Sequence, residues 1–336
     1  MIDLLPSEEQ QQIIDSVAGF LEAQLPVTRL RPGPDGARPA DAGLTDALWH
    51  HIASLGWFGL GVSEAQGGAG YPIVVEMLVA RELGRHAVSP SVTATMAAAH
   101  LAARGGETSL ASLIGGERRV AVANRVSAGG DEYHLIDGRG ADCFLILEET
   151  ETRLYHASAF GRTRPVMSLD DAVTLDRADL PASAQPLLRD ATGDIAHRVS
   201  LLNSAQLLGV AEAALRLAVD YAGAREQFGQ AIGSFQAIKH SCADMAVRAE
   251  AAYAQTFFAG LSQGSRRPDA AYQIAAAKVV SADAALANAR ACIQIHGGIG
   301  FTAECDAHVF LKRAHLLGQL GGERRWLRST LLGSGV

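Results

Sequence analysis

The C-terminal part of the chain, from about residue 195 to 332, carries apolar side chains at helical spacing over long stretches. This feature constrains the fold most, because residues three and four apart share one face of a helix and such stretches predict long antiparallel helices. A third stretch, about Pro268 to Ile295, is rich in alanine, which lets helix axes approach closely, and a fourth covers Ala303 to Leu317. The apolar positions of the first two are Leu201, Leu202, Ala205, Leu208, Leu215 and Val219, then Ile238, Cys242, Met245, Ala249, Ala252 and Phe257. We expect a C-terminal four-helix bundle within residues 195–336.

The N-terminal region, residues 1–117, is also predicted to be helical. It contains Ser7-Glu8-Glu9-Gln10, a capping-box pattern, followed by apolar residues at helical spacing. Further helices are predicted through Leu48 to Leu55, Ile73 to Leu83 and Val92 to Ala103, separated by loops rich in glycine and proline.

Between about Arg118 and Ala182 the pattern changes to short alternating or β-branched runs, each bounded by Gly, Asp or Pro. The segment is long enough for a sheet of five or six strands, with little room for binding loops. The predicted strands are Val120 to Ala123, His134 to Ile136, Cys143 to Leu147, Arg153 to His156, and Ala172 to Leu175. The sequence therefore predicts a mainly α protein with a small β domain in the middle, at residues 118–194.

Charge and composition exclude several classes of function. The net charge is −7 and no run of Lys or Arg forms a phosphate-binding stripe, so we expect no nucleic-acid partner. The first residues are acidic rather than basic, and no apolar stretch approaches the ~18 to 20 residues of a membrane span, so we expect a cytoplasmic enzyme. The cysteines form no CxxC pair and the histidines lack nearby ligands, so we expect no metal site.

The segment REQFGQAIGSFQ, from Arg225 to Gln236, stands out between two long predicted helices. An Arg at the end of a helix could bind a diphosphate, and an exposed Phe three residues later could stack on an adenine ring. Alternatively the segment is an ordinary helix–helix turn, in which Arg225 caps the preceding helix and Phe228 belongs to the core. The spacing alone leaves both interpretations open.

A second segment, QIHGGIGF from Gln294 to Phe301, ends a predicted helix with glycines, where the backbone needs positive φ or close approach to another surface. It lacks the spacing of a dinucleotide fingerprint and is not a P-loop, so no nucleotide role follows from it alone. Within the turn, His296 either hydrogen-bonds near a ligand or holds the turn itself.

Taken together, REQFGQAIGSFQAIKHSCADM and QIHGGIGFTAE resemble the two C-terminal signatures of the acyl-CoA dehydrogenase family, at the separation that the family uses. Weaker agreement extends to LGWFGLGVSEAQGGAGYPIVVEMLVARELGR, so the resemblance covers nearly the whole chain. It implies FAD as cofactor and conversion of an acyl-CoA thioester to the 2-enoyl-CoA, in which a carboxylate takes the α-proton and flavin N5 accepts the β-hydride. An electron-transfer flavoprotein is the implied electron acceptor.

The resemblance also implies which residues contact the cofactor. In this family the two signatures reach the ADP part of an FAD whose ring lies largely in a neighbouring subunit. Matched position by position, Arg225 is expected at the diphosphate, and Gln227 and Phe228 at the adenosine. The other expected FAD contacts are Ile232, Phe235, Gln236, Gln294, Ile295, Gly297 and Gly298.

The catalytic base of the family has no counterpart at its usual positions. The usual base is a Glu shortly after the second signature, and alignment without gaps places Gly321 there, which has no proton acceptor on its side chain. The alternative base position of some members, on the helix before the first signature, falls on Val199 and Ser200. Glu323 remains as a substitute if the loop is rearranged; otherwise it belongs to a solvated charged turn.

The middle domain lacks the family's TEP…GSD loop and its Trp-Ile-Thr or Trp-Ile-Ser strand, which contact the flavin ring. The chain thus retains the residues that would contact the ADP part of an FAD held by a neighbouring subunit. It lacks the base and the loop and strand that would contact the flavin ring of an FAD in its own middle domain. It resembles the short subunits of heterotetrameric acyl-CoA dehydrogenases, which pair with a longer, base-bearing subunit and act on bulky acyl-CoAs such as steroid side chains. The alternatives are a homo-oligomeric enzyme with an unorthodox base and a structural family member without flavin or catalysis.

Overall fold

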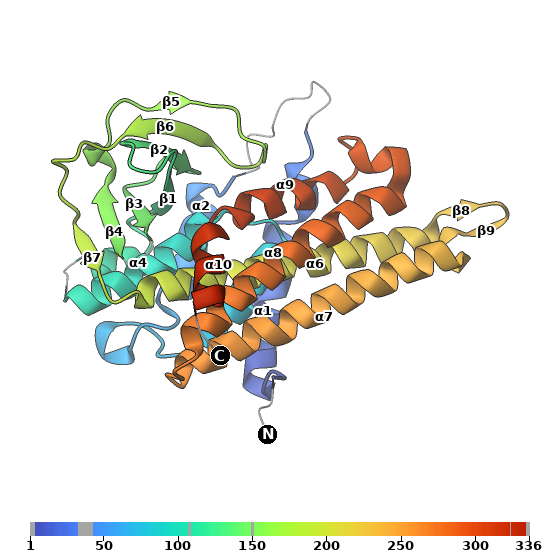
Figure 1. Ribbon diagram of the computed structural model, residues 1–336, viewed down its shortest axis with the longest axis horizontal. Helices are drawn as coiled ribbons and strands as arrows, with labels where there is room; N and C mark the ends of the chain where they lie inside the picture. Colours follow the sequence, from blue (N-terminus) through green and yellow to red (C-terminus); the bar gives the residue numbers. More distant parts are fainter. Residues whose placement is uncertain (1–3, 33–42, 107–108, 149–150, 323, 334–336) are drawn as a thin grey trace.

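The computed structural model describes residues 4–32, 43–106, 109–148, 151–322 and 324–333. These residues form helices, then a sheet, then long helices, so the predicted mainly α fold with a small β domain is confirmed (Figure 1). The N-terminal helices are α1 (Glu8–Gln24), α2 (Asp46–Ser54), α3 (Ile73–Arg85), α4 (Ser91–Gly105) and α5 (Leu110–Ile114). The later helices are α6 (Asp194–Ala224), α7 (Gln236–Gly264), α8 (Ala270–His296), α9 (Ala307–Gly318) and α10 (Arg324–Gly333).

Helix α1 begins where the sequence predicts. The Ser7 hydroxyl accepts a hydrogen bond from the backbone N–H of Gln10 at 3.2 Å, and the Gln10 side chain accepts one from the backbone N–H of Ser7 at 3.0 Å. This capping box satisfies two N–H groups that the first turn of a helix leaves unpaired. The helix buries Ile14, Val17 and Leu21 against the core.

The described strands form one seven-stranded sheet and a separate hairpin. In the sheet, of order β5-β6-β2-β1-β3-β4-β7, β1 is antiparallel to β2 and parallel to β3. Alternate residues of β1 point to opposite faces, so Val120 and Val122 join the core shared with the helices while Ala121 and Ala123 pack in a second cluster around Phe160. The strands are β1 (Val120–Arg125), β2 (Glu132–Ile136), β3 (Cys143–Leu147), β4 (Thr152–His156), β5 (Arg164–Pro165), β6 (Leu175–Asp179) and β7 (Leu188–Asp190).

Two predicted elements were placed wrongly. The strand expected at Ala172 to Leu175 begins only at Leu175, because Asp170 accepts hydrogen bonds from the N–H groups of Ala172 and Val173 and forms a turn. Helix α9 begins at Ala307 rather than Ala303, because the preceding residues make a turn that ends at Cys305. The short β5 and β7 and the last helix, α10, carry no strong pattern in the sequence.

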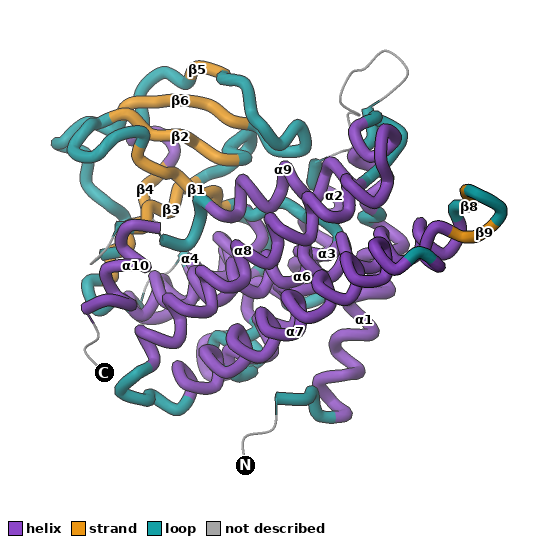
Figure 2. Tube along the Cα trace, turned by 45° about the vertical axis from the view of Figure 1, so that its right-hand side comes forward, coloured by secondary structure: helices purple, strands orange, loops and turns teal. Residues whose placement is uncertain are grey.

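Helix α6 lies at the centre of the helical body, in contact with α3, α4, α7, α8 and α9. Figure 2 shows α6, α7 and α8 running side by side as the longest helices. Every residue of α6 from Val199 to Ala211 is buried. Despite this length, within the described part of the chain none of the helices has the extended apolar character that crossing a membrane requires.

Glycines set the distance between α3 and α6. A Cβ atom added to Gly84 of α3 would overlap the carbonyl oxygen of Gln206, and one added to Gly209 of α6 would overlap the carbonyl oxygen of Arg81. Each glycine therefore lies directly on the backbone of the opposite helix. A side chain at either position would force the helices apart, because protein interiors are close-packed.

Ion pairs surround this crossing. The Glu76 carboxylate of α3 is fully buried and meets His100 Nε2 of α4 at 2.8 Å and the guanidinium of Arg198 of α6. Glu212 of α6 pairs with Arg81 of α3 at 2.7 Å. A buried carboxylate needs such partners, because an unpaired charge in the interior costs several kcal/mol.

We predict that Gly209→Ala lowers the free energy of unfolding by about 1–3 kcal/mol, because the added methyl overpacks the α3–α6 contact. Gly223→Ala is the matched control in the same helix: a Cβ there meets no described atom within 4 Å, so it should be neutral or stabilise by up to about 1 kcal/mol. Urea denaturation of the two variants checks this. Equal stability of both would contradict the close approach.

Candidate functional site: an outward-facing hairpin and a glycine turn

A two-residue hairpin connects α6 to α7, formed by β8 (Glu226–Gln227) and β9 (Gln230–Ala231). Phe228 and Gly229 form its turn with φ of 55° and 78°. Positive φ at both positions is typical of a type I′ turn, whose twist matches that of paired strands. The hairpin projects from the ends of α6 and α7, on the opposite side of the molecule from the sheet (Figure 1).

Phe228 is 92% exposed, so the interpretation that places it in the core is wrong. Its ring contacts Phe235 edge-to-face, with 6.2 Å between the centroids. The left-handed conformation costs a non-glycine residue roughly 1–2 kcal/mol. An aromatic side chain held in water on a strained backbone is more typical of a binding site than of a connecting turn.

Arg225 does not cap the preceding helix through its side chain. Its backbone N–H donates to the carbonyl of Tyr221 at 2.8 Å and so closes α6. Its guanidinium is exposed and has no hydrogen-bond or ion-pair partner among the described residues. The charge is therefore available to an anion from outside the chain.

The second segment forms the end of α8 and a short 3₁₀ helix, η6 (Gly297–Phe301). His296 stacks on Tyr221 of α6 with ring centroids 4.1 Å apart, and its Nδ1 lies 2.8 Å from the carbonyl oxygen of Cys292. Tyr221 lies one helical turn before Arg225. The stack therefore brings the glycine turn close to the hairpin, and His296 has a structural role.

The predicted contact residues differ in how they are presented. Gln294, Gly297 and Gly298 are exposed at the end of α8, whereas Ile295 is only 6% exposed and belongs to the core. At the hairpin, Gln227 and Gln236 are exposed, and Ile232 and Phe235 are half-buried. Contact of these residues with FAD remains a prediction.

Two further features of this surface favour an anionic ligand with a flat ring. Helix α7 begins at Gln236 with no side-chain cap, and unpaired N–H groups at the start of a helix attract phosphate. A Cβ added to Gly298 meets no described atom within 4 Å, so no contact in the described part of the chain requires a glycine there. The backbone there is open to the close approach of a ligand. Arg225, the α7 N-terminus and Phe228 together suit the diphosphate and adenine of a dinucleotide.

Comparisons with known proteins identify the family of the chain. The family profiles "Acyl-CoA dehydrogenase, N-terminal domain" and "Acyl-CoA dehydrogenase, C-terminal domain" match residues 7–110 and 196–333. Acyl-CoA dehydrogenase IpdE2 of Mycobacterium tuberculosis is 32% identical over 321 residues, which cover 94% of each chain. The chain belongs to the acyl-CoA dehydrogenase family. It is accordingly an oxidoreductase, as the two signatures predict.

Other members of the family extend the comparison. Acyl-CoA dehydrogenase FadE34 of Mycobacterium tuberculosis is 36% identical over 306 residues, which are 88% of this chain but only 42% of that longer protein. A structure described as the Tcur3481–Tcur3483 steroid ACAD G363A variant has a TM-score of 0.83 at 21% identity, covering 97% of both chains. This likeness shows a shared fold.

Gly321, where alignment without gaps places the usual base of the family, packs tightly against α6. Gly321 is buried with φ of 73°, and an added Cβ would lie 3.1 Å from Cβ of Asn203 and 3.3 Å from Cα of Ser200. A side chain at this position would therefore require α6 to shift by a few tenths of an ångström and would also be strained by the positive φ. At the alternative position Val199 is buried, and Ser200 has a hydroxyl group and no carboxylate. Glu323 lies outside the described residues.

Lys278 lies beside this position and was not singled out from the sequence. It is buried in α8, and its Nζ donates to Oδ1 of Asn203 and to the carbonyl oxygen of Leu317 at 2.7 Å. It thereby holds the last turn of α9, four residues before Gly321, against α6. The available signal was a lysine in an otherwise apolar, alanine-rich helix, where a charge needs partners.

We predict that Phe228→Asn is more stable than Phe228→Ala by about 0.5–1 kcal/mol, because Asn adopts positive φ with less strain. Little packing is lost in either variant, since the ring is exposed. The same pair of substitutions at Phe235, where φ is −76°, should show no advantage for Asn. Urea denaturation measures both differences, and an equal advantage at the two positions would argue against strain at the hairpin tip.

Gly321→Glu should fail to install a base and should lower the free energy of unfolding by about 1–3 kcal/mol, because of positive φ and the contact with Asn203. Gly318→Ala is the control, since a Cβ there meets no described atom within 4 Å. Thermal melts and a dye-reduction assay with acyl-CoA check the pair. A stable Gly321→Glu variant with new activity would show that the position is open.

Proposed function

We propose that this chain is the subunit without a base in a hetero-oligomeric, FAD-dependent acyl-CoA dehydrogenase, which converts a bulky acyl-CoA, of the size of a steroid side chain, to the 2-enoyl-CoA. One observation carries the proposal: the residues suited to the ADP end of FAD face outward, while Gly321, aligned with the usual base, has no carboxylate and packs tightly against α6. An electron-transfer flavoprotein would accept the electrons.

The chain's own residues would bind and orient one end of the cofactor. Bound FAD supplies the hydride acceptor of the reaction. The Arg225 guanidinium would hold the diphosphate in a charge-assisted contact, and the Phe228 ring would stack on the adenine. Gln236 and Gln294 would donate hydrogen bonds, while Gly297 and Gly298 allow the backbone to come close.

The direction of this surface supports a partner subunit. The hairpin points away from the sheet of its own chain, so the flavin end of an FAD bound there would extend beyond this subunit (Figure 1). The short relative IpdE2 matches this chain over 94% of its length, and the similar steroid ACAD structure is named as a pair of two proteins. These likenesses support a second, longer family member as the partner that carries the base.

Co-expression with a second family member tests the proposal through the flavin-to-protein ratio and the native mass. We expect a colourless isolated chain and one FAD per pair of unlike subunits. A ratio of one FAD per chain in the isolated protein would contradict the proposal that this chain binds only the ADP end of a shared FAD. Dye reduction by that protein would favour a homo-oligomeric enzyme. A stable but colourless and inactive complex would favour a structural role.

Within the complex, Arg225→Met and Phe228→Ala should each weaken FAD binding by roughly tenfold or more, because a charge-assisted hydrogen bond contributes about 1.5–3 kcal/mol and base stacking about 1–3 kcal/mol. Arg162→Met is the matched control: Arg162 is also exposed and has no described partner, but it lies in the β domain. Unchanged FAD affinity in both site variants would contradict the assignment of this surface.

A further inference from the structure

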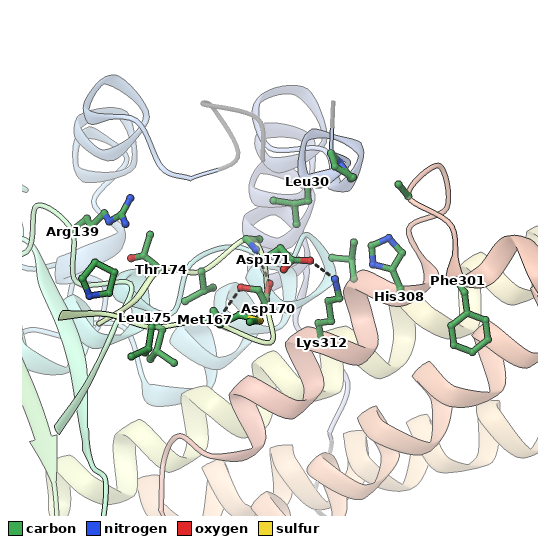
Figure 3. A pocket seen from close by; sticks show the side chains of 18 residues that line it. Leu30, Arg139, Met167, Asp170, Asp171, Thr174, Leu175, Phe301, His308 and Lys312 are labelled. Atoms are coloured by element: carbon green, nitrogen blue, oxygen red, sulfur yellow. Dashed lines mark hydrogen bonds and ion pairs between the residues drawn. The ribbon is translucent and has the colours of Figure 1, made fainter. Parts of the chain in front are cut away.

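A hollow of about 700 Å³ lies between α9, the 3₁₀ turn η6, the loop from β5 to β6 and the turn from β2 to β3. Figure 3 shows its side chains, with Arg139 on one side, Lys312 and His308 on α9, and Phe301 at the far end. The volume falls within the roughly 300–1,000 Å³ that sites for small molecules usually have. None of the lining residues is among those proposed to contact FAD.

One wall is fixed by a buried ion pair. The guanidinium of Arg313 on α9 donates to the Asp170 carboxylate at 2.6 Å and to the carbonyl oxygen of Val88 at 2.5 Å, and both charged side chains are almost fully buried. Asp170 in turn accepts from the N–H of Ala172. The β5–β6 loop is therefore pinned to α9, and the hollow is formed in advance of any ligand. Because Asp170 and Arg313 neutralise each other, neither charge is available to a ligand.

The remaining charges of the lining favour an anion. Arg139 is exposed and has no described partner, while Lys312 pairs with Asp171, whose side chain is 69% exposed. An exposed ion pair contributes little to stability, so a ligand anion can compete with Asp171 at small cost. The lining thus offers one uncompensated positive charge, on Arg139, and a second, on Lys312, that a ligand anion would share with Asp171.

His308 provides a hydrogen-bonding group in the same hollow. Burial lowers the pKa of its imidazole below the usual value, so the ring is neutral near pH 7. Its Nδ1 is buried and has no hydrogen-bond partner in the described part of the chain. Because His308 lines the hollow, its imidazole ring can form a hydrogen bond with a ligand group there.

The rest of the lining is largely apolar, including Leu175, Val309 and Pro165. Met167 and Phe301 stand at the edge with exposures of 94% and 77%. These side chains are accessible to an apolar ligand body that enters the hollow.

We propose that this hollow binds an amphipathic organic anion, with a ring-bearing apolar body against Val309, Leu175 and Phe301. Its carboxylate, sulfonate or phosphate group contacts Lys312 or Arg139, and His308 hydrogen-bonds a polar atom of the ligand.

The probe is 8-anilinonaphthalene-1-sulfonate, an aromatic anion, titrated by fluorescence into the isolated full-length chain without added flavin. We expect saturable binding to one site. Arg139→Gln and Lys312→Gln should each weaken it about threefold to tenfold, and Arg162→Gln, outside the lining, should leave it unchanged. Ala303→Trp should abolish the signal, because Ala303 is exposed and lines the hollow, so that the indole fills the space without burying a new group in the core.

N-phenyl-1-naphthylamine has the same aromatic body as the probe but no sulfonate, and it therefore tests the contribution of the charge. It should bind at least tenfold more weakly than 8-anilinonaphthalene-1-sulfonate. Equal affinity for the two probes would overturn the anion assignment. Unchanged probe binding in Ala303→Trp, or in both Arg139→Gln and Lys312→Gln, would show that the probe binds elsewhere. Either result would contradict the proposed site. Circular dichroism and melting curves confirm that each variant is folded, and neither outcome depends on whether the chain takes part in FAD binding.

Discussion

The close approach of α3 and α6 at Gly84 and Gly209 is the contact on which the rest of the structure depends. Because the two backbones touch there, α6 lies deep enough to be surrounded by α3, α4, α7, α8 and α9. The buried Glu76 and its partners His100 and Arg198 then join α3, α4 and α6. A central helix held on all sides transmits its position to both of its ends.

The two ends of α6 have opposite characters. Near its N-terminal end, Asn203 and Ser200 pack against Gly321, and Lys278 holds the last turn of α9 in place. At its C-terminal end, the chain leaves the body as a hairpin that carries Arg225 and Phe228 into solvent. One rigid helix thus packs tightly against Gly321 near one end and presents the exposed Arg225 and Phe228 at the other.

The buried pair of Arg313 and Asp170 has a comparable role for the β domain. It attaches the β5–β6 loop to α9, and so creates the hollow that contains His308 and Lys312. Periodicity did not predict this arrangement, because the segment around Ala172 has strand-like composition and the turn depends on hydrogen bonds to the side chain and the backbone carbonyl of Asp170. Local pattern is a poor guide where a tertiary ion pair determines the backbone path.

The sequence by itself determined the order of helices and strands, the capping box at Ser7, the family and the lack of a carboxylate at residue 321. These follow from residue type and spacing, which the chain carries before it folds. Only the tertiary structure decided that Phe228 is exposed rather than in the core, that His296 stacks on Tyr221, and that α6 packs tightly against Gly321. Such facts depend on contacts between residues far apart in the chain, and spacing along one segment contains no information about which distant surface will cover it.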